Sequence, residues 1–181
     1  MVTGAEMLSI AAFLEDKHAQ AFPSFGSERT GAPVVAYCRI DDKEIRLREP
    51  IMQPDALIIQ DPTLLHQVDV FSGLRPDGYI LIKTTRSFAA LGIGEVVQGR
   101  PPERLFTVPA TELAFKQVGR AVPNVPLMGA FAAASGMFSL DSAISAIRQK
   151  FSGKVAEGNI AAATEAYDIV IRELKEATAD A

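Results

Sequence analysis

Three short apolar segments, separated by turn-forming and polar residues, constrain the fold of this chain more than any other feature. They are "ALIIQD" (56–61), "GYILIKT" (78–84) and "RLFTVPA" (104–110). A short, continuous apolar run such as the first is typical of a strand covered on both faces. Helical segments alternate with these strands, which predicts an α/β fold with a three-layer α/β/α arrangement and an open, mixed but mostly parallel sheet.

The second half of the chain has the periodicity of helices. We expect helices over "ATELAFKQVG" (110–119), "NVPLMGAFAAASG" (124–136), "SLDSAISAIRQKF" (139–151) and "GNIAAATEAYDIVIRELKEA" (158–177). Gly119 is a predicted C-terminal stop and Ser139 a predicted cap. The last helix carries one apolar stripe, made of Ile160, Ala163, Tyr167, Val170 and Leu174. A chain of 181 residues is predicted to form one domain over 1–181, with a helical C-terminal part at about 124–176.

The first half combines a helix with further strands. Thr3 and Glu6 have the spacing of a capping box, which predicts a helix over "VTGAEMLSIAAFLEDK" (2–17). Two strands, "VVAYCRI" (34–40) and "KEIRL" (43–47), are expected on either side of a turn at Asp41 and Asp42. Short helices are predicted over "TLLHQ" (63–67), with Asp61 as its cap and Pro62 at its first position, and over "SFAALGI" (87–93).

Charge and composition exclude several classes of function. The net charge of −4 and the pI of about 5.2 give no broad positive field, so neither nucleic acid nor an anionic membrane is an expected partner. No apolar run approaches the length of a membrane span, and the first residues lack the basic charge of a signal peptide. The chain is therefore expected to be cytoplasmic.

The reactive side chains are few. Cys38, the single cysteine, rules out an internal disulfide or a four-thiolate metal site, and its apolar neighbours predict a small buried residue. His18 and His66 lack partners at metal-ligand spacing and are expected to be non-catalytic. "GIGEVVQG" (92–99) departs from the spacing of a phosphate loop, so we expect an ordinary loop. No Gly-x-Ser-x-Gly elbow is present, which argues against a hydrolase.

The segment "FPSFGSERTGAPVVAYCRI" (22–40) is the best candidate for a functional loop. Two prolines restrict it at both ends, and two glycines allow backbone angles that other residues avoid. Arg29 has the forked geometry that holds a carboxylate or a phosphate. An alternative is that Glu28 and Arg29 pair with each other or with a neighbouring subunit and only brace the loop. Its candidate residues are Ser24, Gly26, Ser27, Glu28, Arg29, Thr30 and Gly31.

Asn124 allows two interpretations. It is either the N-cap of the helix that follows, or it marks a helix start that faces a ligand and favours an anion such as a coenzyme A phosphate. The same helix has unusually small side chains, which predicts close packing against another helix or subunit. The small residues are Gly129, Ala130, Ala132, Ala133, Ala134 and Gly136.

Four segments, in this order, resemble a known family. They are "VTGAEML", "FPSFGSERTGAPVVAYCRI", "REPIMQPDALIIQDPTLL" and "VPATELAFKQVGRAVPNVPLMGAFAAASG". They are similar to the gamma subunit of pyruvate:ferredoxin oxidoreductase and its relatives among the 2-oxoacid:acceptor oxidoreductases, over the chain as far as about Phe138. The form "GSERTGAPV" is nearer to the pyruvate and branched-chain oxoacid types than to the 2-oxoglutarate type.

The resemblance implies a noncatalytic gamma subunit of a larger enzyme that is inactive alone. That enzyme oxidatively decarboxylates a 2-oxoacid to acyl-CoA and reduces ferredoxin, with alpha, beta and delta subunits as partners. Thiamine diphosphate, magnesium, iron–sulfur clusters and coenzyme A are expected in the assembled complex, and none is expected on this chain alone. Ser24, the loop from Gly26 to Gly31 and Asn124 would then lie on the substrate and coenzyme A side or at a subunit interface.

The start of this sequence differs from the usual start of the family. The family usually begins with a strand and a Gly-x-Gly-Gly-Gln-Gly turn, whereas this sequence starts at the following helix, so the sheet is expected to lack that strand and turn. Unpaired backbone groups would then favour a homo-oligomer of the isolated subunit. The alternative from another class of function is a stand-alone α/β module that binds a nucleotide or an acyl carrier.

Overall fold

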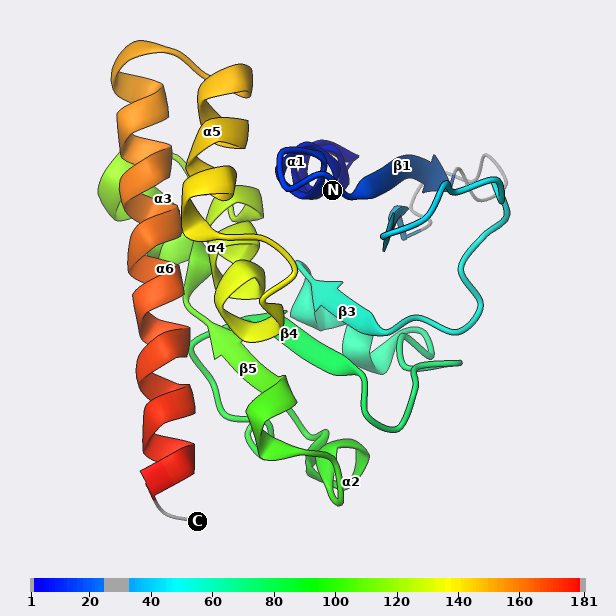
Figure 1. Ribbon diagram of the computed structural model, residues 1–181. Helices are drawn as coiled ribbons and strands as arrows, with labels where there is room; N and C mark the ends of the chain where they lie inside the picture. Colours follow the sequence, from blue (N-terminus) through cyan, green and yellow to red (C-terminus); the bar gives the residue numbers. More distant parts are fainter. Residues whose placement is uncertain (1, 25–32, 180–181) are drawn as a thin grey trace.

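The computed structural model describes residues 2–24 and 33–179 of the chain. Its centre is a parallel sheet of three strands, β3 (Ala56–Ile59), β4 (Tyr79–Lys83) and β5 (Leu105–Val108), in the order β3-β4-β5 (Figure 1). All three coincide with the strands predicted from the apolar runs. The α/β class and the parallel sheet are thereby confirmed.

The middle strand shows why the sequence of these strands is apolar throughout. Leu81 of β4 faces one side of the sheet, where it joins Phe106 and Val108 in the larger core. Ile80 and Ile82 face the other side and form a second core. All three β4 side chains are fully buried. Because both faces are covered, a polar residue at any of these positions would lose its contact with water.

Long helices cover the face of Leu81. They are α1 (Val2–Phe13), α3 (Ala110–Val118), α4 (Asn124–Ser135), α5 (Leu140–Lys150) and α6 (Gly153–Ala179) (Figure 1). Gly119 ends α3 with a φ of 76°, and the Ser139 side chain caps α5 by accepting the N–H of Ser142. Both predicted helix boundaries are confirmed. Thr3 lies inside α1, so the predicted capping box is wrong.

The small side chains of α4 allow α6 to approach closely. A Cβ added to Gly129 would lie 2.2 Å from the carbonyl oxygen of Ala163. Ala163 and Val170 of the predicted α6 stripe are fully buried, and Tyr167 packs against the same core. The predicted close packing is confirmed, with α6 of the same chain as the neighbour. We call α3, α4 and α6 the helical flank.

Short helical turns cover the opposite face of the sheet. They are η1 (Pro62–His66) and α2 (Gly94–Val97), whose Leu65 and Val97 pack against the second core, whereas η2 (Pro102–Arg104) contacts α6. The cap of η1 is as predicted, since Asp61 Oδ1 accepts the N–H of Thr63 at 3.0 Å. The predicted helix over 87–93 is wrong, because this segment forms turns and Gly92 has a φ of 75°. The predicted loop over 92–99 instead contains α2.

A separate antiparallel hairpin lies beside α1. It consists of β1 (His18–Ser24) and β2 (Val35–Asp41), with His18 opposite Asp41. The strand predicted over 34–40 is confirmed, but its partner is β1, and the prediction of a strand over 43–47 is wrong. Residues 43–47 are mostly exposed, so no burial on a core face favours an extended strand there. Phe22 to Ser24, predicted as loop, complete β1.

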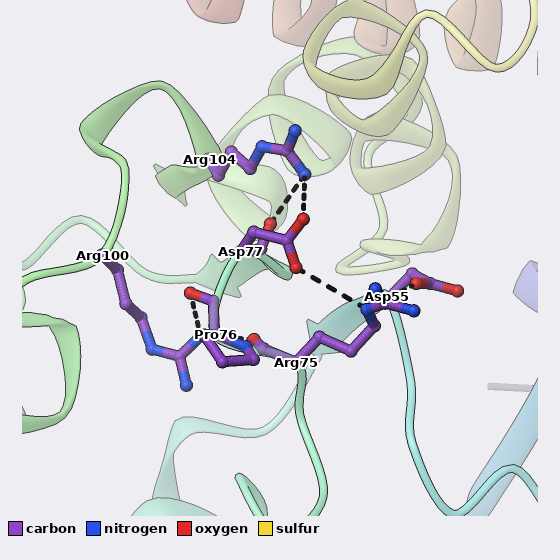
Figure 2. A network of polar contacts seen from close by, with 6 residues as sticks. All are labelled: Asp55, Arg75, Pro76, Asp77, Arg100 and Arg104. Carbon is purple, nitrogen blue, oxygen red and sulfur yellow. Dashed lines mark hydrogen bonds and ion pairs between the residues drawn. The ribbon is translucent and has the colours of Figure 1, made fainter.

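Two arginines hold the turn that leads into β4. Arg100 Nη1 donates to the carbonyl oxygens of Arg75 and Pro76, at 2.8 and 3.2 Å. Arg104 Nη1 donates to the carbonyl oxygen of Asp77 at 2.7 Å. Figure 2 shows the two guanidinium groups on the same turn. We call Arg100 and Arg104 the arginine clamp, because together they satisfy three successive carbonyl groups at the amino end of the sheet.

Side-chain contacts extend this network (Figure 2). Arg75 Nε lies 3.5 Å from Asp55 Oδ1 and 3.6 Å from Asp77 Oδ1. The guanidinium carbon of Arg104 lies 4.6 Å from the ring centroid of Tyr79, the first residue of β4. The ion pairs are largely exposed and contribute little, whereas the stacked and hydrogen-bonded Arg104 fixes the turn against the sheet.

Candidate functional site

A broad groove separates the hairpin from the parallel sheet. It has a volume of about 1160 Å³ and is lined by β2, by residues 44–47 and 51–60, by the first turns of α1 and by α4. Figure 1 shows the hairpin and β3 on the side of the molecule away from α6. We call this space the groove, and the hairpin, residues 42–55 and β3 together the groove flank. The groove is large enough to admit a polypeptide segment or a cofactor-sized ligand.

The backbone of β3 faces this groove. Within the described residues, β3 pairs with β4 alone, from Ala56 opposite Tyr79 to Ile59 opposite Ile82. Its second edge therefore presents backbone N–H and C=O groups without a strand partner. Such an edge can accept an extended polypeptide through main-chain hydrogen bonds.

Exposed apolar side chains concentrate along the groove. Five of the eleven large hydrophobic residues that are exposed in the described chain line it. Met52 and Leu47 are the most exposed of the five, at 77% and 60%. The five are Val34, Val35, Leu47, Met52 and Val68. A cluster of this kind is typical of interaction surfaces and ligand-binding grooves.

Asn124 lies in the wall of the groove, where three elements meet. A Cβ added to Gly4 of α1 would lie 3.8 Å from the Cβ of Asn124 and 3.5 Å from the Nε2 of Gln60, which follows β3. Asn124 is the first residue of α4, after Pro123, and its side chain makes no capping bond. The N-cap interpretation is therefore wrong. Its Oδ1 is buried without a hydrogen-bond partner.

The other predicted site residues lie around the end of the hairpin. Ser24 is the last residue of β1, half-buried and opposite Val35, which lines the groove. The loop candidates lie outside the described residues. These candidates are Gly26, Ser27, Glu28, Arg29, Thr30 and Gly31. The sequence did not single out Gly4 or Gln60, although a polar residue directly after a parallel strand is a usual position for a ligand contact.

The residues that could bind a metal or a cluster do not come together. Cys38 lines the groove but is only half-buried in the hairpin, and burial raises the pKa of its thiol to about 12. His18 and His66 are exposed on different elements. Among the described residues, no group of three histidine, cysteine or carboxylate side chains could hold a metal ion. A protonated lone thiol does not fit an iron–sulfur cluster, which requires several thiolates.

The described helices give no candidate for a membrane span, because none is both long and apolar enough. A three-stranded parallel sheet with a packed helical flank and an open groove defines the class: an α/β domain that presents a surface for assembly or ligand binding. Comparisons with known proteins narrow this class to a family.

A family model, described as pyruvate ferredoxin/flavodoxin oxidoreductase, matches residues 1–169. The gamma subunit common to the pyruvate and ketoisovalerate oxidoreductases of Pyrococcus abyssi is 43% identical over 169 residues, with 92% of this chain and 89% of the relative covered. The pyruvate synthase subunit PorC of Methanothermobacter marburgensis is 41% identical over 167 residues, with the same coverage of 92% and 89%.

A solved structure agrees with the sequence relatives. The crystal structure of the pyruvate oxidoreductase subunit PORC from Thermotoga maritima superimposes with a TM-score of 0.75 at 29% identity, covering 92% of this chain and 88% of that one. The chain belongs to the pyruvate ferredoxin/flavodoxin oxidoreductase family. The resemblance found in the sequence segments is thereby confirmed.

Proposed function

We propose that this chain is the noncatalytic gamma-type subunit of a 2-oxoacid:ferredoxin oxidoreductase of the pyruvate or branched-chain type. The enzyme would decarboxylate a 2-oxoacid oxidatively, transfer the acyl group to coenzyme A and pass the electrons to ferredoxin. The observation that carries the proposal is the 43% identity to a common gamma subunit over 92% of the chain. The groove supports it, because an apolar surface and an unpaired strand edge suit a subunit that acts within an assembly.

The proposal assigns the cofactors to partner subunits. Thiamine diphosphate with magnesium and the iron–sulfur clusters need metal ligands, which the described part of this chain does not group together. The alpha, beta and delta subunits would hold these groups, and the complex would work in the cytoplasm. This chain would contribute binding surface and position its partners, without supplying a catalytic group.

The groove flank is the side that would meet those partners. Val35, Leu47 and Met52 would lose their exposure when a neighbouring subunit covers the groove. Arg29 of the adjoining loop would hold a carboxylate or phosphate of the substrate or coenzyme A, because its guanidinium group offers a forked pair of donors. The start of α4 at Asn124 would favour the same negative charge through the free N–H groups of its first turn.

An anaerobic purification from the native cell tests the assembly. A tagged copy of the chain should recover alpha, beta and delta partners, and the purified material should reduce ferredoxin or a viologen dye only when a 2-oxoacid and coenzyme A are present. Recovery of the chain alone, without 2-oxoacid-dependent reduction, would contradict the proposal. Such a result would favour the stand-alone nucleotide- or acyl-carrier-binding module.

A substitution in the loop tests the role of Arg29. In the reconstituted complex, Arg29→Ala should lower turnover by about tenfold, the usual effect of one lost charged contact, while the isolated chain keeps its unfolding midpoint. Arg148→Ala is the matched control, since the exposed side chains of Arg148 and Glu157 pair with each other at 2.7 Å. Unchanged turnover in the Arg29 variant would remove this residue from the proposal.

A further inference from the structure

We propose that the hairpin carries an anion-binding site that takes a phosphoryl group. The site consists of the outer face of the hairpin, formed by Gln20, Phe22, Tyr37 and Arg39, and of Arg48 beside it. The inference does not rest on the proposed function, because each step concerns contacts within this chain.

The hairpin has two different faces. Alternate residues of a strand point to opposite sides. Ala19 and Ile40, which are opposite each other, pack against the main core next to α1. The pairs Gln20 with Arg39 and Phe22 with Tyr37 therefore share the outer face. That face combines aromatic and polar side chains, the composition of a binding surface rather than of a core.

Aromatic contacts fix the guanidinium group of Arg39. The rings of Phe22 and Tyr37 lie 5.3 Å apart between centroids. The guanidinium carbon of Arg39 lies 5.7 Å from the centroid of Phe22. Stacking of this kind holds the plane of the group while its N–H donors remain available at the edge. Arg39 is thus pre-positioned as a donor and loses little freedom when it binds an acceptor.

In the cross-strand pair of Gln20 and Arg39, one buried side-chain atom of each residue lacks a hydrogen-bond partner. Gln20 Oε1 and Arg39 Nη1 are both shielded from solvent and unbonded, two of only four such side-chain atoms in the described residues. A buried guanidinium nitrogen without an acceptor is costly, so a group that accepts from it is stabilising when it binds. An anion supplies that acceptor, and the Gln20 amide, turned by 180°, presents its NH₂ group to the same anion.

A small cavity adjoins this pair and is bordered by a second arginine. Its volume is about 280 Å³, and its wall consists of Gln20, Ala21, Phe22 and Arg48. Among the described residues, no carboxylate borders it, and Arg48 takes part in none of the ion pairs found there. By contrast, Arg46, two residues earlier, pairs with Glu44 at 3.0 Å. As far as the described residues show, the cavity therefore has positive charge without a counter-charge.

The chemistry of these groups selects a phosphoryl group over a chloride-sized ion. Two arginines and one amide offer several N–H donors in planar arrays, which match the oxygens of a phosphate or diphosphate. The cavity exceeds the space of several water molecules, enough for one phosphoryl group. Arg39 does not itself border the cavity, so the proposal requires the long Gln20 and Arg48 side chains to rotate and admit the anion to it.

Calorimetric titration of the full-length chain at low salt tests the site, with inorganic phosphate, pyrophosphate and ADP as probes. We expect saturable binding of pyrophosphate and a shift of the Gln20 side-chain amide signals in a ¹H–¹⁵N NMR spectrum. Tighter binding of ADP than of pyrophosphate would identify a nucleotide as the source of the phosphoryl group. Equal binding of the two would identify the phosphoryl group alone as the ligand.

Variants that remove one positive charge test where on the chain the pyrophosphate binds. Arg48→Gln should weaken pyrophosphate binding by about tenfold, the usual loss for one charge-assisted contact, and Arg48→Lys should restore part of it. Arg172→Gln on α6 is the control and should leave the affinity within about twofold, because salt screens its distant charge. No saturable binding to the wild-type chain, or equal weakening by Arg48→Gln and Arg172→Gln, would overturn the proposal. Unchanged circular dichroism of both variants verifies that they fold.

Discussion

The helical flank and the groove flank of this molecule differ in how far their apolar side chains are buried and their backbone groups are paired. In the helical flank, Gly129 and Ala163 bring two helices into backbone contact, and the side chains between them are buried. In the groove flank, Leu47 and Met52 remain more than half exposed beside a strand edge that has no partner in the described chain. The difference teaches that the chain itself buries the helical flank, whereas the groove flank keeps the exposed apolar side chains and the strand edge for which we propose a partner.

Buried polar atoms follow the same division. Three of the four unbonded buried side-chain atoms in the described residues, those of Gln20, Arg39 and Asn124, lie on the hairpin or in the groove wall. The fourth belongs to Asn159, whose Nδ2 still donates to the carbonyl oxygen of Val155 at 2.9 Å. At the amino end of the sheet, the arginine clamp satisfies its carbonyl groups. Most of the buried polar atoms without a hydrogen bond thus lie on the side of the molecule that we expect to bind a partner or a ligand.

The largest effect is expected at the contact between α4 and α6. Gly129→Ala would place a Cβ 2.2 Å from the backbone oxygen of Ala163, so the helices must separate, and the free energy of unfolding should fall by about 3 kcal/mol. Urea denaturation measures the change. Gly94→Ala is the control, because its added Cβ meets its nearest atom at 3.9 Å and should leave stability nearly unchanged. Equal stability of the two variants would contradict close packing as the basis of this flank.

The arginine clamp should contribute less to the free energy of unfolding than the contact between α4 and α6. Arg104→Ala removes a hydrogen bond to the Asp77 carbonyl and the contact with the Tyr79 ring, and should lower the free energy of unfolding by about 1 kcal/mol. Arg46→Ala, which removes an exposed ion pair, should change it by a few tenths of a kcal/mol at most. Comparison of both variants by urea denaturation checks this order, and a larger effect at Arg46 would refute it.

A smaller, pH-dependent effect is expected from Glu165. Hydrogen bonds from Lys116 and Gln117 of α3 lower the pKa of this α6 carboxyl group below its ordinary value of 4.5. A lowered folded-state pKa stabilises the protein above the unfolded pKa, and the contribution is lost as pH falls through the folded value. With screening at this partly exposed site, Glu165→Gln should cost about 0.5 kcal/mol at neutral pH. Urea denaturation should show the difference shrinking in acid; a pH-independent difference would refute the assignment.

The smallest effect on folding is expected in the groove flank. Met52 is 77% exposed, so Met52→Ser should change the stability of the isolated chain by less than about 0.5 kcal/mol. If a partner covers the groove, the same substitution should weaken its binding by about tenfold, as loss of one buried apolar contact does. Sedimentation of the reconstituted complex measures the second effect. Substantial unfolding of the isolated variant would show that this side chain belongs to the core of the chain.

Much of the parallel sheet and its helices could be predicted from the sequence. The runs containing Ile58, Leu81 and Phe106 are apolar because strands covered on two faces tolerate little else, and that requirement is local. Gly119 and Ser139 mark helix boundaries through backbone conformation and capping, which are local as well. The function was predicted from the four segments that resemble the family, since that resemblance does not depend on the geometry of the site.

The hairpin could not be predicted in the same way. Neither face of β1 is fully buried, so "HAQAFPS" lacks the strong alternation of a half-buried strand, and its partner is chosen by pairing across the intervening loop. The groove wall joins Gly4, Gln60 and Asn124 from three distant segments, a proximity that no spacing in the sequence encodes. The sequence indicated Asn124 through its position at the start of an apolar helix. It gave no sign that the buried Oδ1 of this residue lacks a hydrogen bond.

By itself, the sequence determined the three buried strands, the helices of the second half and the family, because burial on both faces and helix boundaries act through neighbouring residues. Only the tertiary structure decided which strand pairs with β2, which helix meets Gly129, and where the chain leaves an edge and polar atoms without partners. These features depend on contacts between distant segments, whose energies appear only when the chain is folded.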